Sequence, residues 1–244
     1  MRNFYFLILN FLTVINLYGQ NNLWYISADN ITKTLTVDTD DGAEGSIGSW
    51  YKWEINNNAN ILGTQDDLDG PEQNDNNKAI ITWNATFPTS YTENNTSELI
   101  KDYTVNATEF NNCDNIIGNT TTTDVKLVKL DILNIEMDSS ICNENEATVT
   151  IYGTPDSEIT LNITGGQLIN TNLIKIGSNG KVDVSLKPIN NSTEIIINIV
   201  EIKYIKQNPF NQEFSISKNN GFTYDTTNLK IPVGKSPVIT PIMF

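Results

Sequence analysis

The sequence contains no histidine and only two cysteines. Without histidine, the chain has neither the commonest general base nor a Ser-His-Asp or Cys-His arrangement, and most zinc sites are excluded. The sequence also lacks a nucleophile elbow, a P-loop and a glycine-rich dinucleotide fingerprint. We therefore expect a protein that is not an enzyme.

Basic residues are also scarce, because 15 Lys and Arg stand against 29 Asp and Glu, which gives a formal net charge of -14. Affinity for nucleic acids rests on Lys and Arg displacing counterions from phosphates, so we expect no nucleic-acid partner. Most of the carboxylates are expected to lie on solvated surface, where net charge favours solubility.

One long apolar stretch, FYFLILNFLTVI (residues 4–15), follows Arg2 and precedes a polar segment that ends at Gln20. This order is typical of a secretory signal peptide, and cleavage is expected after Gly19. The stretch is shorter than the about 20 residues that span a bilayer. An uncleaved anchor or a buried first helix is the alternative. No later apolar run approaches spanning length, so we expect a soluble exported protein with no transmembrane segment in the mature chain.

Short alternating runs dominate the rest of the sequence, among them SWYKWEI (49–55), AIITW (79–83) and IKDYTVNAT (100–108). Successive side chains of a strand point to opposite faces of a sheet, so this alternation predicts half-buried strands. Asn, Thr, Ile and Asp are abundant, and turn-rich segments separate the runs. The pattern predicts an all-β fold.

The Y-x-W run at Tyr51, the strand ending at Trp83 and the Y-x-V run at Tyr103 resemble PKD-like and immunoglobulin-like modules of the Bacteroidota. Such modules recur in secreted and surface proteins, especially those of gliding flavobacteria. The segment ATVTIYGTPDSEITLNITGG (147–166) is similar to the opening of a second module. A single large sandwich or barrel across the chain is the alternative. The resemblance implies two tandem immunoglobulin-like β-sandwiches, at residues 20–135 and 136–220. With the signal peptide at 1–19 before them and an extended proline-containing segment at 221–244 after them, they account for the whole sequence.

Two local expectations concern how these parts connect. Residues 124–137 (DVKLVKLDILNIEM) are expected to form one long strand that leads from the first sandwich into the second. Asn-Gly is a strong signal for a tight turn, so Ser178, Asn179 and Gly180 are expected to close a β-hairpin.

An acidic loop is a candidate calcium site. Gln65, Asp67, Asp69 and Gly70 match positions 1, 3, 5 and 6 of a calcium-binding loop, where alternating carboxylates meet a hard cation. Gln at the first position and Asn76 at the twelfth both weaken affinity. A solvated acidic loop is therefore favoured over calcium ligation by Asp67 and Asp69, and no other cofactor is expected.

The two cysteines, Cys113 and Cys142, could form a disulfide in an oxidising compartment. If residues 124–137 run straight, their ends lie roughly 40 Å apart, which is beyond disulfide reach. Two free thiols are therefore favoured over the bridge. The resembling modules usually hold an internal pair each, and this sequence departs from that pattern.

Trp50 and Trp83 are candidates for stacking on a glycan if they are exposed. Aromatic side chains on alternating strands belong more often to a core. Tyr51 and Trp53 share one parity and are expected to face inward, which leaves Trp50 as the more exposed residue.

The sequence ends on an apolar tail, Pro241, Ile242, Met243 and Phe244. Such a tail can dock on its own domain, or it can be offered to a partner as an added strand.

These features predict a non-enzymatic exported protein in the periplasm, an outer-membrane complex or the cell surface. Its expected role is to mediate contacts with protein partners of the cell envelope in gliding, adhesion or type IX secretion. A carbohydrate-binding module or lectin-like adhesin is the first alternative. A glycosidase, which needs two convergent carboxylates in a groove, is the second.

Overall fold

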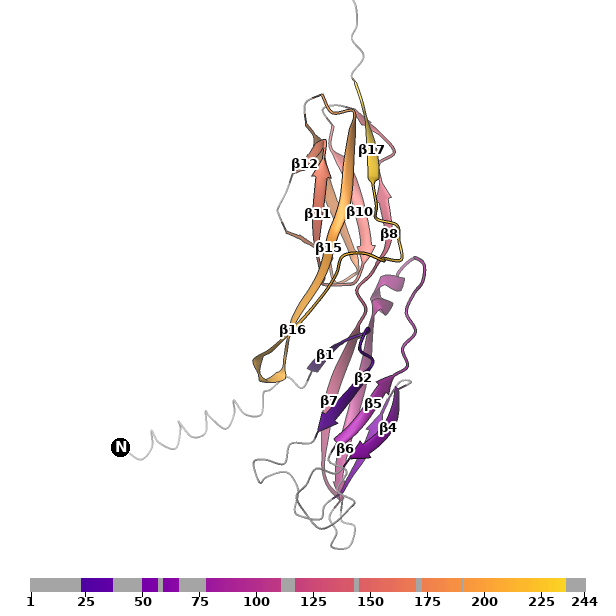
Figure 1. The fold of residues 1–244 in the computed structure, drawn as a ribbon, viewed down its shortest axis with the longest axis vertical. Helices are drawn as coiled ribbons and strands as arrows, with labels where there is room; N and C mark the ends of the chain where they lie inside the picture. Colours follow the sequence, from indigo (N-terminus) through magenta and orange to yellow (C-terminus); the bar gives the residue numbers. More distant parts are fainter. Residues whose placement is uncertain are drawn as a thin grey trace, which may run out of the picture. The chain divides into compact units, whose positions relative to one another are not determined.

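The computed structural model describes residues 23–36, 50–56, 59–65, 78–110, 117–142, 145–169, 173–189 and 191–235. These residues form mainly β-strands, with two short 3-10 helices, η1 (Asn95–Leu99) and η2 (Pro209–Asn211) (Figure 1). The expected all-β class is confirmed. Within the described ranges, no helix has the length and apolar character to cross a membrane.

The chain divides into two compact units whose segments alternate along the sequence. Unit 1 comprises the described residues within 1–85, 101–127 and 206–214, and unit 2 comprises those within 86–100, 128–205 and 215–244. The domain boundaries expected at residues 135 and 220 stay predictions.

Unit 1 contains a four-stranded sheet in the order β1-β7-β6-β3 and a three-stranded sheet in the order β2-β5-β4. In the second sheet β5 pairs antiparallel with both neighbours, and β3 pairs antiparallel with β6 in the first. The strands are β1 (Leu23–Ser27), β2 (Thr32–Thr36), β3 (Trp50–Ile55), β4 (Ala59–Gln65), β5 (Lys78–Trp83), β6 (Ile100–Phe110) and β7 (Ile117–Val128).

The core of unit 1 follows the predicted alternation. Ala79, Ile81 and Trp83 of β5 are buried, and each is followed or preceded by a half-buried residue. The Trp83 ring centroid lies 4.7 Å from that of Tyr103 on β6, which belongs to the other sheet. The two sheets therefore enclose a common apolar layer, and burial raises the pKa of Tyr103. The strands predicted at SWYKWEI and AIITW are confirmed.

Unit 2 also has two sheets, one in the order β12-β14-β10-β8 and one in the order β13-β11-β15-β17-β9, with β16 pairing with β15. Strand β17 pairs in parallel with β9. The strands are β8 (Ile132–Met137), β9 (Ile141–Cys142), β10 (Ala147–Gly153), β11 (Glu158–Thr164), β12 (Gly166–Leu168), β13 (Ile174–Lys175), β14 (Lys181–Pro188), β15 (Glu194–Asn208), β16 (Gln212–Lys218) and β17 (Leu229–Gly234). Residues 206–208 of β15 and 212–214 of β16 belong to unit 1.

Strand β15 supplies much of the core of unit 2, and its buried positions change once from odd-numbered to even-numbered residues. Ile195, Ile197 and Ile199 are buried, whereas farther along the buried residues are Ile202 and Tyr204. The register with β11 shifts between Thr160 and Leu161, which leaves one extra residue on β15. A bulge of this kind turns the following side chains to the other face, so both halves of β15 bury their apolar residues.

Two expectations about connections are wrong. Residues 124–137 do not form one strand, because β7 ends at Val128 and β8 begins at Ile132. The Asn179-Gly180 turn does not close a hairpin, since the strands on either side of it, β13 and β14, belong to different sheets. Gly180 has a φ of 73°, and a Cβ there would overlap the hydroxyl oxygen of Thr96. Glycine is therefore required both by the backbone and by the packed neighbour.

Residues 221–244, which are expected to form an extended segment, contain strand β17. Within them, β17 pairs antiparallel with β15 and parallel with β9. The Val233 N–H donates to the Thr193 carbonyl of the β15 side at 2.8 Å. Neighbouring residues of a strand point their N–H groups in opposite directions, so Pro232, which has no N–H, occupies a position facing away from β15.

Candidate functional site

An aromatic and charged surface lies on the outer side of the sheet β14-β10-β8 in unit 2. Antiparallel register places Tyr152 of β10 between Lys181 and Asn134, and Thr150 between Asp183 and Glu136. On β10 the intervening Val149 and Ile151 are buried, so Thr150 and Tyr152 face outward. We call the following seven residues the tyrosine surface: Tyr91, Asn134, Glu136, Thr150, Tyr152, Lys181 and Asp183.

Short contacts hold the polar groups of the tyrosine surface in place. The Tyr152 hydroxyl donates to Glu136 Oε2 at 3.0 Å, and the Thr150 hydroxyl donates to Asp183 Oδ1 at 2.7 Å. Lys181 Nζ lies 5.8 Å from the centroid of the Tyr152 ring and 3.7 Å from Asp183 Oδ1. Partial burial and the adjacent Glu136 carboxylate raise the pKa of Tyr152 to about 12, so this hydroxyl remains a hydrogen-bond donor at neutral pH.

Tyr91 reaches the tyrosine surface from the segment that precedes η1. Its ring centroid lies 4.6 Å from that of Tyr152, and the ring planes are inclined by 41°. The Asn95 side chain fixes the loop, because it accepts from the Thr92 N–H at 3.1 Å and donates to the Ser90 carbonyl at 2.9 Å. The next residue, Thr96, is buried and donates to the Asn179 carbonyl at 3.1 Å. Within unit 2, the loop that carries Tyr91 is therefore held against the turn that precedes β14.

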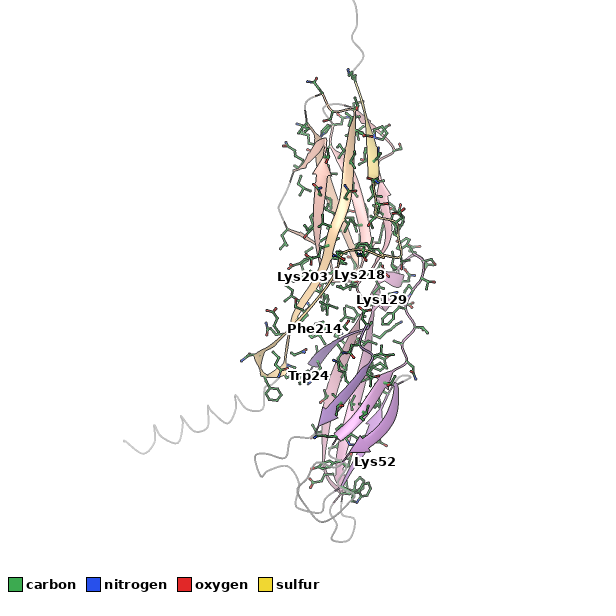
Figure 2. The ribbon with its side chains drawn as sticks, viewed as in Figure 1. Trp24, Lys52, Lys129, Lys203, Phe214 and Lys218 are labelled. Carbon is green, nitrogen blue, oxygen red and sulfur yellow. The ribbon has the colours of Figure 1, made fainter. Side chains whose placement is uncertain are left out.

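A second polar cluster in unit 2 surrounds the buried carboxylate of Asp131. Its oxygens accept from the Thr223 N–H at 2.7 Å, the Thr223 hydroxyl at 2.8 Å and the Ile132 N–H at 3.0 Å. Lys129 and Lys218, both labelled in Figure 2, place their Nζ atoms 3.3 and 3.7 Å from this carboxylate. The Asp131 N–H donates a hydrogen bond to the Thr154 hydroxyl at 2.9 Å.

The Asp131 cluster therefore joins the start of β8 to two distant segments of unit 2. Its carboxylate is almost completely shielded from solvent and already accepts several hydrogen bonds, which is the arrangement a buried charge requires to be tolerated. We interpret the Asp131 cluster as a set of contacts that stabilises the fold rather than as a ligand site.

The two tryptophans proposed for glycan stacking lie in unit 1. Trp83 is 1% exposed and packs against Tyr103, so it presents no face to a sugar. Trp50 is half-buried, and its ring stacks on Phe110 with centroids 4.3 Å apart and planes inclined by 11°. A nearly parallel stack covers one face of each ring, which leaves Trp50 a reduced platform.

The other candidate residues were the acidic loop, the cysteines and the apolar tail. The calcium candidates Asp67 and Asp69, together with Cys113, lie outside the described residues, as does the tail from Pro241 to Phe244. Cys142 lies exposed in β9 and forms no disulfide with any described residue. The part of the chain that the structure describes holds no group of three or more His, Cys, Asp or Glu side chains that could bind a metal ion.

Sequence reasoning missed the tyrosine surface, although it predicted the strand that carries Tyr152. Tyr91 lies in no strand and is 61 positions from Tyr152, so no local pattern links the two rings. The available signal was parity, because Tyr152 and Thr150 alternate with the apolar Val149 and Ile151.

Neither a scan against protein-family models nor a search of curated proteins found a match to this chain.

Proposed function

We propose that the protein is a non-enzymatic, exported, immunoglobulin-like component that mediates protein–protein contacts in a bacterial cell-surface apparatus for gliding, adhesion or type IX secretion. The observation that carries the proposal is the strand order of unit 2. If β8, β10, β11, β12, β14, β15 and β17 are taken as strands A, B, C, D, E, F and G, one sheet has the order A-B-E-D and the other contains C-F-G. The same strand order occurs in immunoglobulin constant-type sandwiches, and this agreement supports an immunoglobulin-like assignment for unit 2.

The chemistry of the chain is consistent with binding between folded surfaces. Immunoglobulin-like sandwiches serve chiefly as carriers of binding faces and loops, so the role is inferred partly by analogy with the fold. Export rests on the n-, h- and c-region layout of residues 1–19. The formal net charge of -14 favours partners with complementary basic surface.

The test is crosslinking of tagged full-length protein in its native cell envelope, followed by affinity purification. A variant that lacks residues 237–244 serves as the matched control for the apolar tail. The proposal expects envelope proteins of a secretion, adhesion or motility apparatus to be recovered reproducibly with the full chain. Recovery of the protein alone under mild detergent, with crosslinking shown to be effective, contradicts it. Equal recovery with the truncated variant would place the contacts outside the tail.

A second candidate function, a carbohydrate-binding module or lectin-like adhesin, is favoured by the tyrosine surface. Aromatic rings beside hydrogen-bonding side chains are typical of ligand sites in which stacking provides affinity and polar groups provide specificity. Binding of the folded protein to none of the glycans on an array would count against this candidate.

A further inference from the structure

We propose that the tyrosine surface of unit 2 is a binding site for a neutral saccharide. This inference rests on the second candidate function and assigns its site and ligand class. The sheet face offers Tyr152 beside two carboxylates, a hydroxyl, an amide and an ammonium group, and Tyr91 adds a second ring from a separate segment.

The first step concerns the rings. The electron-rich face of an aromatic ring attracts the C–H groups on the apolar side of a pyranose. Tyr91 and Tyr152 are half-buried and inclined by 41°, so neither ring fully covers the face of the other. Trp50 and Phe110 differ in this respect, because their nearly parallel planes hide one face of each ring. The tilted pair therefore leaves ring surface that a sugar can contact beside Lys181, whose Nζ lies over the Tyr152 ring.

The second step concerns the polar groups. Glu136 and Asp183 lie on the two strands that flank β10, so their backbones are about 10 Å apart on either side of Thr150. Each carboxylate already accepts one hydroxyl, and a carboxylate has further lone pairs for the hydroxyls of a ligand. Lys181 can donate to a hydroxyl or a ring oxygen.

The third step concerns order before binding. The Tyr152 hydroxyl fixes Glu136, Thr150 fixes Asp183, and the Asn95 side chain fixes the loop that presents Tyr91. Groups that are held in place before the ligand arrives lose little conformational entropy on binding. The surface is thus suited to a small ligand whose individual contacts are weak.

Charge selects among sugars. The tyrosine surface carries two carboxylates and one ammonium group, and the whole chain is strongly acidic. Sialic acids, uronic acids and sulfated sugars would be repelled, whereas neutral hexoses would not. A protein partner is less well matched, since Lys, Glu and Asp are depleted in protein interfaces and three of the seven residues of this surface are Glu136, Lys181 and Asp183.

The experiment probes the full-length protein on an array printed with neutral and acidic glycans, followed by calorimetric titration of the neutral oligosaccharides that bind. The test variants are Tyr91→Ala and Asp183→Asn, and Phe210→Ala is the matched control. Phe210 is a 68% exposed aromatic side chain at η2, far in the sequence from the tyrosine surface. Thermal melting followed by circular dichroism verifies that each variant is folded.

We expect neutral glycans to bind, Tyr91→Ala to weaken that binding about tenfold or more, Asp183→Asn to weaken it severalfold, and Phe210→Ala to leave it unchanged. Neutral-glycan binding that survives both test variants overturns the site and leaves the carbohydrate-binding function standing. Binding of acidic glycans alone overturns the ligand class. Silence of the folded protein on the whole array, or a protein partner whose binding Tyr91→Ala abolishes, overturns the saccharide proposal, whereas the assembly proposal is decided separately by the crosslinking result.

Discussion

The outer face of the sheet β3-β6-β7 in unit 1 and the outer face of β8-β10-β14 in unit 2 are both polar, but their side chains are used differently. Between β6 and β7, short side chains pair across the strands, with Thr108 and Thr120 at 3.0 Å, Thr122 and Asn106 at 2.9 Å, and Thr104 and Asp124 at 3.1 Å. In each pair, the polar groups of the two side chains are directed at each other across the neighbouring strands. Such pairs stabilise the sheet itself.

On the face in unit 2, register brings together two ring faces and charges of both signs, and one ring comes from outside the sheet. The face in unit 1 is thus self-paired, and it too carries rings and charges, since Trp50 stacks on Phe110 and Lys126 pairs with Asp102. The two faces differ in how their rings are arranged: Trp50 and Phe110 are nearly parallel and both belong to the sheet, whereas Tyr91 comes from a loop and is inclined by 41° to Tyr152.

The largest expected effect separates the core aromatics of unit 1 from its surface aromatics. Trp83→Ala should lower the free energy of unfolding by about 4 kcal/mol, because it removes a completely buried ring and leaves a cavity beside Tyr103. Trp50→Ala should cost about 1 kcal/mol, since its ring is half-buried. Denaturant unfolding followed by fluorescence can measure both, because all four tryptophans belong to unit 1. Equal losses would contradict the assignment of Trp83 to the core.

The next prediction contrasts a buried charge in unit 2 with an exposed one in unit 1. Asp131→Ala should destabilise the protein by about 3 kcal/mol, because two lysines and the Thr223 N–H lose their common acceptor in a shielded site. Asp102→Ala, which removes the partner of Lys126 on an exposed strand face, should cost under about 1 kcal/mol. Calorimetric unfolding of both variants provides the comparison. A loss at Asp102 as large as that at Asp131 would show that burial does not determine the effect.

A third prediction sharpens the difference between the two faces through the ionisation of Tyr152. Tyrosine labelled with carbon-13 at Cζ should show Tyr152 titrating near pH 12, and Glu136→Gln should move this pKa toward 10. The pKa of Tyr152 in the folded protein lies above its ordinary value of 10.0. Protonated Tyr152 therefore makes its full contribution to the free energy of unfolding below about pH 10, and this contribution is lost as the pH rises through about 12. A titration near pH 10 in the unmodified chain would contradict the contact between Tyr152 and Glu136.

The smallest effect is expected on the self-paired face of unit 1. Thr108→Ala removes one exposed side-chain hydrogen bond, that with Thr120. Cross-strand pairs of this kind contribute about 0.5 kcal/mol to the free energy of unfolding. The same denaturant measurement applies, with Thr108→Ser as the control that retains the hydroxyl. A loss of several kcal/mol would mean that this face has a role in packing which its exposure does not indicate.

Much of the correct sequence interpretation rested on the alternation of side chains between the two faces of a strand. Ala79, Ile81 and Trp83 share one face of β5, so the burial of Trp83 was readable from the sequence. The all-β class followed from many such runs.

The sequence-based predictions failed where contacts with side chains distant in the sequence determine where a strand ends. Residues 124–137 look like one alternating strand, yet a break occurs at Asp131, whose carboxylate is held by Thr223, 92 positions away. The tyrosine surface depends in the same way on a loop residue, Tyr91, that no period marks. Hydrogen bonds and ring contacts over such separations leave no local signature in a single sequence.

The most direct test of the tyrosine surface is to titrate full-length protein, labelled at tyrosine Cζ with carbon-13, with neutral oligosaccharides derived from β-glucan, mannan, galactan and chitin. We expect at least one of them to shift the Tyr91 and Tyr152 signals saturably while the buried Tyr103 signal stays in place. Saturable binding that leaves both signals unchanged, or no binding by any of these sugars, would contradict the assignment of this surface as a saccharide site.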